Sequence, residues 1–424
     1  MRKMDQIMLN RRQAVTLGAG SVFALTLAAC GGSNGGADTS TAEGDGAAGA
    51  VDAANIKVGF ICLHDENSTY DLNFINGAKE ACEQLGIPEE NYFIKTGIDE
   101  GEACYDAAAE LVDMGCSYVF ADSFGHEDFM IEAAKEFPEV QFAHATGTKA
   151  HTEGLANYHN AFAAIYDGRY LAGVAAGLKL KEMIDNGEIT ADEAKMGYVG
   201  AFTYAEVVSG YSSFYLGAKS IVPEVTMDVT FTGSWYDETA EKEAANKLIK
   251  GGCVLISQHA DSMGAPTACE TAGIPNVSYN GSTVDACPKT FIVSSRINWA
   301  PYFVYSIGAT MEGQPFDTDW TGTIETDSVQ LTDVNEAAAA KGTVEALEEV
   351  KAGLIDGSVH AYDVSAFTVD GKELDTFAPG EATDPTFDPE TKLVYDGYLH
   401  ESEYRSAPYF DVTIDGITLL DQQF

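Results

Sequence analysis

The amino-acid sequence predicts an α/β protein built from two similar halves. From residue 57 onward, short apolar runs of strand length alternate with helical patterns, which is typical of parallel sheets with right-handed crossovers. The same alternation starts again after a long helical stretch near residue 168. The body from residue 55 to residue 424 is also long enough to favour two lobes over one core. We therefore expect two α/β lobes that face each other across a cleft.

The first half contains helical patterns that end at glycine or proline. The stops are Gly86, Gly115 and Pro138. The elements expected here are strands at 57–63, 91–96, 117–121 and 141–144, and helices at 73–85, 101–114 and 128–137.

The second half begins with a long helix, expected at 168–184. The elements expected after it are strands at 196–199, 227–231, 254–257, 276–279 and 291–294, and helices at 206–220, 238–249, 266–272 and 301–311. Residues 357–424 are acidic and contain Val/Thr/Tyr-rich pieces such as 409–414. We expect these to form β-hairpins or extended segments packed on one lobe.

The loops that follow the strands hold the side chains expected of a binding site. Ligands of open α/β sheets lie just beyond the carboxyl ends of the strands. Here these loops alternate aromatic residues with uncharged or acidic hydrogen-bonding residues, and they contain no Lys or Arg; they are residues 65–70, 122–126, 202–206, 233–237 and 259–261. Such a cleft suits a flat, neutral, heteroaromatic ligand rather than a phosphate or a carboxylate.

One of these loops follows the apolar run 254–256 directly. The chain turns polar from Ser257 to Asp261, and a helical pattern begins near Pro266. Asp261 therefore has two interpretations: a hydrogen-bond acceptor in the cleft, or a cap for the next helix.

Residues 1–29 predict an export signal rather than part of the fold. Basic residues at Arg2, Lys3, Arg11 and Arg12 precede the uncharged, mostly apolar run 14–28, which is too short to span a bilayer. The run ends in Leu27-Ala28-Ala29-Cys30, which resembles the lipobox of bacterial lipoproteins and implies lipidation of Cys30. The paired arginines leave Sec and twin-arginine export both open.

Residues 30–54 follow as a predicted tether. The segment is rich in Gly, Ala, Ser, Thr and acids and lacks aromatic residues, so it has too little apolar surface to order itself. We expect it to hold the folded body clear of the membrane to which Cys30 is anchored.

The overall charge excludes one class of partner. The chain has 24 Lys and Arg against 66 Asp and Glu, a formal net charge of −42. Such a surface repels nucleic acid and anionic lipid, so we expect no nucleic-acid partner. Hydrophobic residues make up 45% of the chain, which is enough to build a core.

The sequence shows no pattern that would bind a metal or a cofactor. The eight cysteines contain no C-x-x-C pair, and we expect those other than Cys30 to be buried free thiols. The chain also lacks a G-x-S-x-G elbow, a P-loop and an H-E-x-x-H motif, so we expect neither an enzyme nor a cofactor.

Six short motifs follow one another along the chain. They are Ser123-Phe124-Gly125, His144-Ala145-Thr146-Gly147, Gly168-Arg169-Tyr170-Leu171-Ala172-Gly173, Ser234-Trp235-Tyr236-Asp237, Gln258-His259-Ala260-Asp261-Ser262 and Asn298-Trp299-Ala300-Pro301-Tyr302. In their order and spacing they resemble the basic membrane protein (BMP) family of ABC-transporter substrate-binding lipoproteins. The resemblance covers roughly residues 55–356.

The resemblance implies a type I periplasmic-binding-protein fold, with two Rossmann-like lobes and a hinge of three segments. It implies a monomer on the outer face of the cell membrane that passes its ligand to an ABC permease and its ATPase. The implied boundaries are a signal at 1–29, a tether at 30–54, lobe I at 55–160 plus about 299–318, lobe II at 161–298 plus about 319–356, and a C-terminal extension at 357–424.

Characterised members of the family bind purine nucleosides, and some related proteins take free purine bases or other heterocycles. By resemblance, Tyr70 and Trp235 are the stacking aromatics and Asp261 is the acidic ligand contact. Near the position of a further family aromatic this chain has Gly210, with Tyr211 beside it, and no residue matches the family's ligand-site lysine. This difference favours a base, or both base and nucleoside, over a nucleoside alone.

The residue pattern adds candidates outside that match, and each also has a structural interpretation. The further ligand-binding candidates are Phe124, His126, Tyr204, His259, Asn298 and Trp299, with His64 as a weaker one. Trp235 at a strand end is also compatible with a core position, and lone histidines commonly satisfy local hydrogen bonds. Asn298 and Trp299 fall where the chain should cross between lobes, so they serve either the hinge or the ligand.

Two other functions remain compatible with these residues. A purine nucleoside-cleaving enzyme would use Asp261 as its acid. A sensory binding protein for another heteroaromatic ligand would share the same cleft without feeding a transporter.

Overall fold

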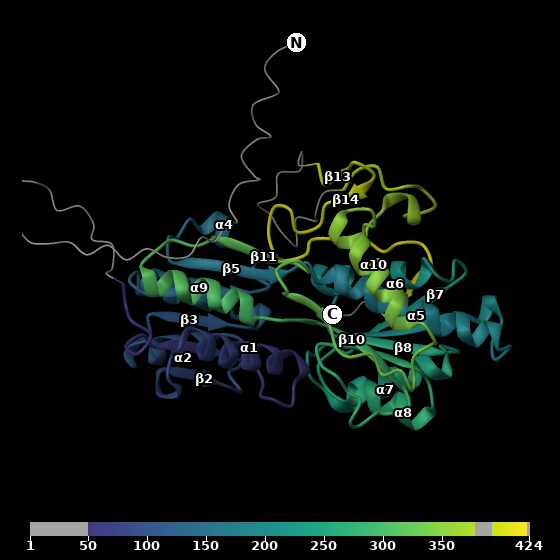
Figure 1. Cartoon of the computed structure of the whole chain (residues 1–424), viewed down its shortest axis with the longest axis horizontal. Helices are drawn as coiled ribbons and strands as arrows, with labels where there is room; N and C mark the ends of the chain where they lie inside the picture. The colour runs from purple at the N-terminus through teal and green to yellow at the C-terminus, as the bar shows by residue number, and fades with distance from the viewer. Residues whose placement is uncertain (1–49, 378–391, 422–424) are drawn as a thin grey trace, which may run out of the picture. The chain divides into compact units, whose positions relative to one another are not determined.

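The computed structural model describes residues 50–377 and 392–421, and the fold reported below refers to these ranges (Figure 1). The predicted signal, Cys30 and the tether up to residue 49 lie outside the described residues. The last residues of the predicted tether already contact lobe I, because the Val51 N–H donates to the Met311 carbonyl at 2.7 Å. In the described ranges no helix is both long enough and apolar enough to cross a membrane.

Lobe I is built on a six-stranded parallel sheet in the order β11-β5-β4-β3-β1-β2. Its strands are β1 (Val58–Ile61), β2 (Tyr92–Lys95), β3 (Tyr118–Ala121), β4 (Gln141–Ala145), β5 (Tyr158–Ala163) and β11 (Asp319–Gly322). Its helices are α1 (Thr69–Leu85), α2 (Glu102–Asp113), α3 (Glu127–Glu136), α4 (Ala150–Glu153) and α9 (Ala300–Glu312). Every residue of β1 and β3 is buried, as expected of central strands covered on both faces.

Lobe II is built on a seven-stranded sheet in the order β12-β10-β9-β8-β6-β7-β15, parallel except for the β10–β12 pair. Its strands are β6 (Lys195–Gly200), β7 (Thr226–Phe231), β8 (Leu255–His259), β9 (Asn276–Tyr279), β10 (Phe291–Ile297), β12 (Val329–Leu331) and β15 (Ile417–Leu419). Its helices are α5 (Ile165–Asp185), α6 (Ala205–Lys219), α7 (Glu238–Lys250), α8 (Gly264–Ala272) and α10 (Thr343–Asp356).

The two sheets repeat one strand order, β2-β1-β3-β4-β5 in lobe I and β7-β6-β8-β9-β10 in lobe II. The prediction of a twice-repeated α/β pattern is thus confirmed. The chain passes between the sheets three times: after β5, after β10 and after β11. The third crossing lies later than the sequence suggested, because residues 319–322 pair with β5 and extend the sheet of lobe I.

Helices α5 and α6 of lobe II pack unusually closely, and glycines make this possible. A Cβ atom at Gly173 would lie 2.0 Å from the Phe214 carbonyl oxygen, and one at Gly217 would lie 2.1 Å from the Tyr170 carbonyl oxygen. Any larger residue at either position would push the two helices apart. This contact explains the glycine that ends the motif at 168–173.

The C-terminal extension packs on lobe II. It contains a short hairpin of β13 (Val394–Tyr395) and β14 (Tyr398–Leu399), and its last strand, β15, joins the sheet of lobe II beside β7. Tyr362, Tyr409 and Phe410 belong to the same buried cluster as the lobe II core. The extension also contacts lobe I, where the Ser406 N–H donates to Asp319 Oδ1 at 2.9 Å.

The seven cysteines within the described ranges are all buried and free, as the sequence predicted. Burial raises the pKa of the Cys253 thiol to about 12. A protonated, enclosed thiol of this kind behaves as a small apolar side chain.

Candidate functional site

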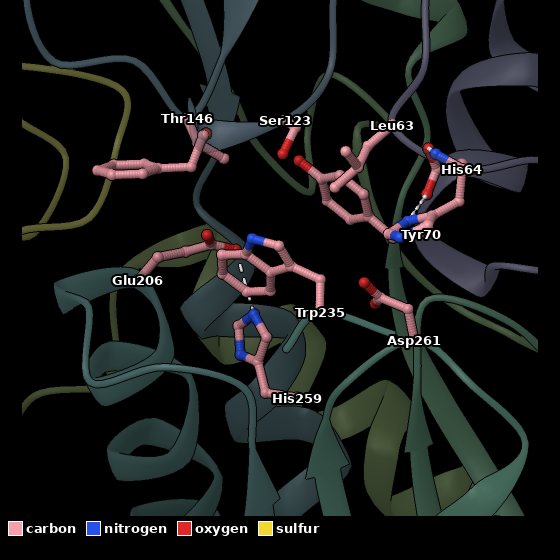
Figure 2. Close-up of a pocket in the computed structure, with 11 residues that line it drawn as sticks. Leu63, His64, Tyr70, Ser123, Thr146, Glu206, Trp235, His259 and Asp261 are labelled. Carbon is pink, nitrogen blue, oxygen red and sulfur yellow. Dashed lines mark hydrogen bonds and ion pairs between the residues drawn. The ribbon is translucent and has the colours of Figure 1, made fainter. Parts of the chain in front are cut away.

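A cavity lies between the lobes, at the carboxyl ends of both sheets (Figure 2). Lobe I contributes the residues after β1, β3 and β4, and lobe II those after β6, β7 and β8. The lining residues are Leu63, His64, Tyr70, Asp71, Ser123, Phe124, Thr146, Glu206, Trp235, His259 and Asp261. Of the sequence candidates, Tyr70, Phe124, Trp235, His259, Asp261 and the weaker His64 are among them.

The Asp261 carboxylate faces this cavity and does not cap the following helix. Helix α8 begins at Gly264, whose N–H donates to Ser262 Oγ at 3.0 Å. Asp261 Oδ1 accepts one long hydrogen bond, from Asn280 Nδ2 at 3.4 Å. Burial, and secondarily the negative charge of Asp71, raise the pKa of Asp261 well above its ordinary value. The helix-cap interpretation is therefore wrong, and the carboxylate is short of hydrogen-bond donors.

Trp235 presents its indole to the cavity from the loop after β7. Its backbone carbonyl accepts the Asp261 N–H at 3.0 Å, which fixes the two residues relative to each other. The indole meets Phe202 edge to face, with ring centroids 5.0 Å apart. Tyr204 does not line the cavity itself, but its ring centroid lies 6.0 Å from that of Trp235. Lobe II thus supplies a half-buried aromatic wall.

Phe124 of lobe I stacks on Tyr204 of lobe II, with ring centroids 4.8 Å apart. Both rings are more than one-third exposed, which is unusual for aromatic side chains of this size. The pair therefore borders the cavity on a side that is exposed to solvent.

Tyr70 lies in the first turn of α1 and has its hydroxyl engaged within lobe I. The hydroxyl donates to the Asp122 carbonyl at 2.8 Å, and the ring meets Phe74 edge to face. Only the apolar body of Tyr70 therefore remains available to a ligand.

His259 and Glu206 form a polar pair in lobe II. His259 Nε2 lies 3.2 Å from Glu206 Oε1. Burial lowers the pKa of His259, which favours the neutral ring. Glu206 was not among the residues selected from the sequence, although it belongs to one of the strand-end loops. Its place in the first turn of α6 was the available signal, since helix N-termini favour acidic side chains.

Asp71 also lines the cavity and was not selected from the sequence. It is completely buried and accepts the His64 N–H at 2.8 Å and the Ser68 hydroxyl at 2.5 Å. Burial acts to raise the pKa of Asp71, but the hydrogen bonds from His64 and Ser68 outweigh it and leave the pKa lowered.

Four of the predicted ligand residues do not line the cavity. Tyr204 only borders it, and for His126, Trp299 and Asn298 the prediction of a ligand contact was wrong. His126 is buried with Nε2 3.0 Å from the Ile98 carbonyl oxygen, and Nδ1 accepts the Ser123 N–H at 3.4 Å. Trp299 is 1% exposed and stacks on Phe74 at 4.3 Å in the lobe I core. Asn298 lies at the second crossing, where its Oδ1 accepts the Ala300 N–H at 3.3 Å and its N–H donates to the Ser328 carbonyl. Its contacts are those of a hinge residue.

Direct contacts between the lobes close the cavity on one side. The Thr69 N–H of α1 donates to the Asp261 carbonyl at 3.1 Å. Asn73 Nδ2 of the same helix donates to the Asn280 carbonyl at 3.1 Å. The lobes are therefore in a closed arrangement, and the same short stretch of lobe II meets both lobe I and the cavity.

The cavity is acidic and aromatic. Its lining within the described chain includes three carboxylates and neither lysine nor arginine. The buried Arg169 is engaged elsewhere in lobe II: its guanidinium carbon lies 4.6 Å from the centre of the Tyr279 ring, and Nη2 donates to the Gln258 carbonyl. Among residues 50–377 and 392–421, no Lys or Arg thus lines the cavity where it could pair with an anionic ligand.

One donor cluster near the cavity has the spacing of a metal site. Ligand atoms of Cys62, Asp71 and Asp122 lie within 4.8 Å of one another, and all three residues are buried. Burial, followed by the charges of the two aspartates, raises the pKa of the Cys62 thiol well above its ordinary value. Only the thiolate is a good metal ligand, and both Asp71 oxygens already accept hydrogen bonds, so this cluster does not fit a metal ion.

Comparison with known proteins places this architecture among solute-binding proteins. The family model described as "ABC transporter substrate-binding protein PnrA-like" (Bmp) matches residues 61–359. A purine-binding protein of Brucella abortus is 32% identical over 61% of this chain and 69% of its own length. A putative ABC transporter glucose-binding protein of Haloferax volcanii is 30% identical over 60% of this chain and 61% of its own.

Solved structures show the same fold. An ABC-transporter solute-binding protein of Aeropyrum pernix superposes with a TM-score of 0.60 at 17% identity, covering 72% of this chain and 92% of that protein. The predicted two-lobed periplasmic-binding-protein fold is thus confirmed.

Proposed function

Because the chain belongs to the Bmp family of PnrA-like ABC transporter substrate-binding proteins, we propose that its ligand is a purine base or a purine nucleoside. As a member of that family it serves an ABC importer on the extracytoplasmic side. The observation that carries the ligand proposal is the pairing of the Trp235 indole with the donor-poor Asp261 carboxylate in one cavity. The name of the Brucella abortus relative points in the same direction.

The chemistry of a purine matches this cavity in two respects. Its flat ring covers an aromatic face, and stacking of this kind contributes about 0.5–1.5 kcal/mol beyond burial. Its edge carries N–H groups, which a carboxylate accepts in hydrogen bonds worth roughly 1.5–3 kcal/mol. The carboxylates that line the cavity would repel a phosphate group, so we expect nucleotides not to bind.

Closure of the lobes brings these contacts together. A ligand held between the Asp261 side of lobe II and the Tyr70 side of lobe I stabilises the closed state by its differential affinity for that state. The contacts from Thr69 and Asn73 then add to the ligand's own contacts.

Calorimetric titration tests the proposal directly. The panel contains adenine, hypoxanthine, guanine, adenosine, inosine and, because of the Haloferax volcanii relative, glucose. We expect at least one purine to bind with a Kd in the micromolar range or tighter, with little change between low and high salt. Binding of glucose with no binding of any purine would overturn the proposal.

A cleavage assay separates binding from catalysis. A binding protein returns inosine and adenosine unchanged after prolonged incubation. Release of free base, abolished by Asp261→Asn, would instead identify a nucleoside-cleaving enzyme.

We also propose that the protein is anchored through lipid on Cys30, which the lipobox-like sequence 27–30 supports. Cys30→Ser should give an unprocessed and unacylated chain by mass spectrometry. Unchanged acylation of that variant would remove the anchor from the proposal.

A further inference from the structure

A second carboxylate, Glu206, lies across the cavity from Asp261, with the Trp235 indole between them (Figure 2). Glu206 belongs to the first turn of α6, and its side chain is 11% exposed. Like any ionised carboxylate it can only accept hydrogen bonds. A ring that lies along Trp235 therefore meets an acceptor at each end.

His259 holds Glu206 in place. Its Nε2 lies 3.2 Å from Glu206 Oε1, and its Nδ1 is buried without a hydrogen-bond partner among the described residues. Nδ1 faces α6 at Gly210, where a Cβ atom would come within 2.9 Å of it. If the ring proton is on Nε2, this N–H donates to Glu206 and Nδ1 is an unpaired acceptor. In the other tautomer, the Nδ1 N–H would be buried without an acceptor, and the Nε2 lone pair would face the Glu206 carboxylate.

This arrangement occupies one Glu206 oxygen and leaves the other for a ligand. His259 is a positioning residue here, because the lowered pKa of its buried ring keeps it neutral and it contributes a fixed donor rather than a positive charge. Glu206 thus retains its full acceptor strength toward the cavity.

Glu206 also lies on the side of the cavity where Phe124 and Tyr204 are exposed to solvent. Tyr204, two residues earlier in the chain, stacks on Phe124, and these two rings are the exposed aromatics of the site. Asp261, only 4% exposed, lies on the opposite side and next to Asn280. A sugar on the ring nitrogen that faces this side would have to pass Glu206.

We propose that Glu206, positioned by His259, accepts the N–H of the imidazole ring of a free purine, so that the receptor selects bases over nucleosides. The proposal rests on the purine ligand proposed above. A nucleoside carries its sugar on the nitrogen that would otherwise donate to Glu206, and it leaves this carboxylate without a partner. Asp261 accepts from the opposite edge of the ring in the same complex.

The sharpest probe is 9-methyladenine, which lacks the N–H at position 9 but adds no sugar. We expect the unmodified protein to bind adenine ten- to a hundred-fold more tightly than 9-methyladenine, since one charge-assisted hydrogen bond is lost. In Glu206→Gln the preference should fall to about threefold or less, because the amide still accepts from His259 but lacks the charge. Glu243→Gln, an exposed change on α7, is the matched control and should keep the full preference.

Each outcome bears on the proposal. Equal affinity of the unmodified protein for adenine and 9-methyladenine would overturn it while leaving purine binding intact, and this comparison needs no variant to fold. A preference for adenine over 9-methyladenine that survives in Glu206→Gln, or that disappears only in Asp261→Asn, would also overturn it. Another group would then accept the N–H of the imidazole ring. Failure of adenine, hypoxanthine, guanine and their nucleosides to bind at all would instead remove the proposed function itself.

Discussion

Asp71 of lobe I and Asp261 of lobe II occupy comparable places and have opposite properties. Both lie beyond the carboxyl end of a strand, both line the cavity, and they are 0% and 4% exposed. Asp71 accepts from His64 and Ser68 at 2.8 and 2.5 Å, and its pKa is lowered in spite of burial. Asp261 accepts one bond at 3.4 Å, and burial raises its pKa well above the ordinary value.

The difference shows that burial alone does not identify a functional carboxylate. A carboxylate supplied with donors by its own lobe is part of the local structure, and Asp71 ties the start of α1 to the loop after β1. A carboxylate that is buried without such donors lowers the stability of the protein, and a ligand that supplies hydrogen-bond donors to it is bound favourably. By this criterion we expect lobe II to form the polar contacts with a ligand, and lobe I to provide the surface that closes over it.

The largest effect is expected on protein stability when Asp71, whose hydrogen-bond donors come from its own lobe, is removed. Asp71→Ala should lower the free energy of unfolding by about 3 kcal/mol, because the Ser68 hydroxyl and the His64 N–H lose a charged acceptor. Asp261→Ala should cost little or even stabilise the ligand-free protein. Urea unfolding of both variants measures the contrast, and equal losses would break the comparison between the lobes.

The contributions of Asp71 and Asp261 to protein stability should depend on pH in opposite directions. The folded-state pKa of Asp71 is lowered, so its contribution is present above its unfolded pKa and is lost as the pH falls through the folded value. The folded-state pKa of Asp261 is raised, so its contribution is present at low pH and is lost as the pH rises through the folded value.

The next largest effect concerns ligand affinity. Asp261→Asn should weaken purine binding about ten- to a hundred-fold, corresponding to roughly 1.5–3 kcal/mol for a hydrogen bond to a charged group. It should also change the ranking among adenine, guanine and hypoxanthine, because an amide both donates and accepts. Titration with these three bases measures both effects. Unchanged affinity and ranking would leave Asp261 without a role in recognition.

The sequence predicted the fold and the positions of Trp235 and Asp261 at the cavity, because both depend on local patterns. Strand and helix periodicity identifies the repeated α/β order, and polar residues after an apolar strand must lie at the sheet edge where ligands bind. Strands β5, β11, β12 and β15 of the two sheets were missed. The last three are short segments that gain strand structure by pairing with β5, β10 and β7. Such pairing depends on residues distant in the chain.

The errors in the site have the same origin. Trp299 lies at a predicted lobe crossing, but Phe74, far away in sequence, stacks on its indole and holds it in the core. His126 has both ring nitrogens engaged by backbone groups of its own lobe, which no residue pattern reveals. Glu206 was overlooked because nothing in its own segment shows that His259 lies 3.2 Å away.

A smaller effect should link binding to pH. The raised pKa of Asp261 favours the protonated carboxyl in the ligand-free cavity, whereas a ligand N–H requires the charged form. Binding should therefore release a proton, and affinity should rise with pH, by up to about tenfold per unit below that pKa. Titration in two buffers of different ionisation enthalpy detects the proton. Proton uptake, or affinity that falls as pH rises, would show that Asp261 binds as a donor.

The smallest effect should come from the closing contact of lobe I. Asn73 Nδ2 donates to the Asn280 carbonyl at 3.1 Å across the cleft, and the residue is 7% exposed. Asn73→Ala removes one neutral hydrogen bond, worth about 1 kcal/mol, so all purines should bind roughly fivefold more weakly through faster dissociation. Asn246→Ala, on the exposed side of α7, is the matched control and should leave binding unchanged. The ranking of ligands should be preserved in Asn73→Ala, since this bond forms whenever the lobes close and touches no ligand. A changed ranking would mean that lobe I also makes contacts that discriminate between ligands, and the division of roles between the two lobes would then be wrong.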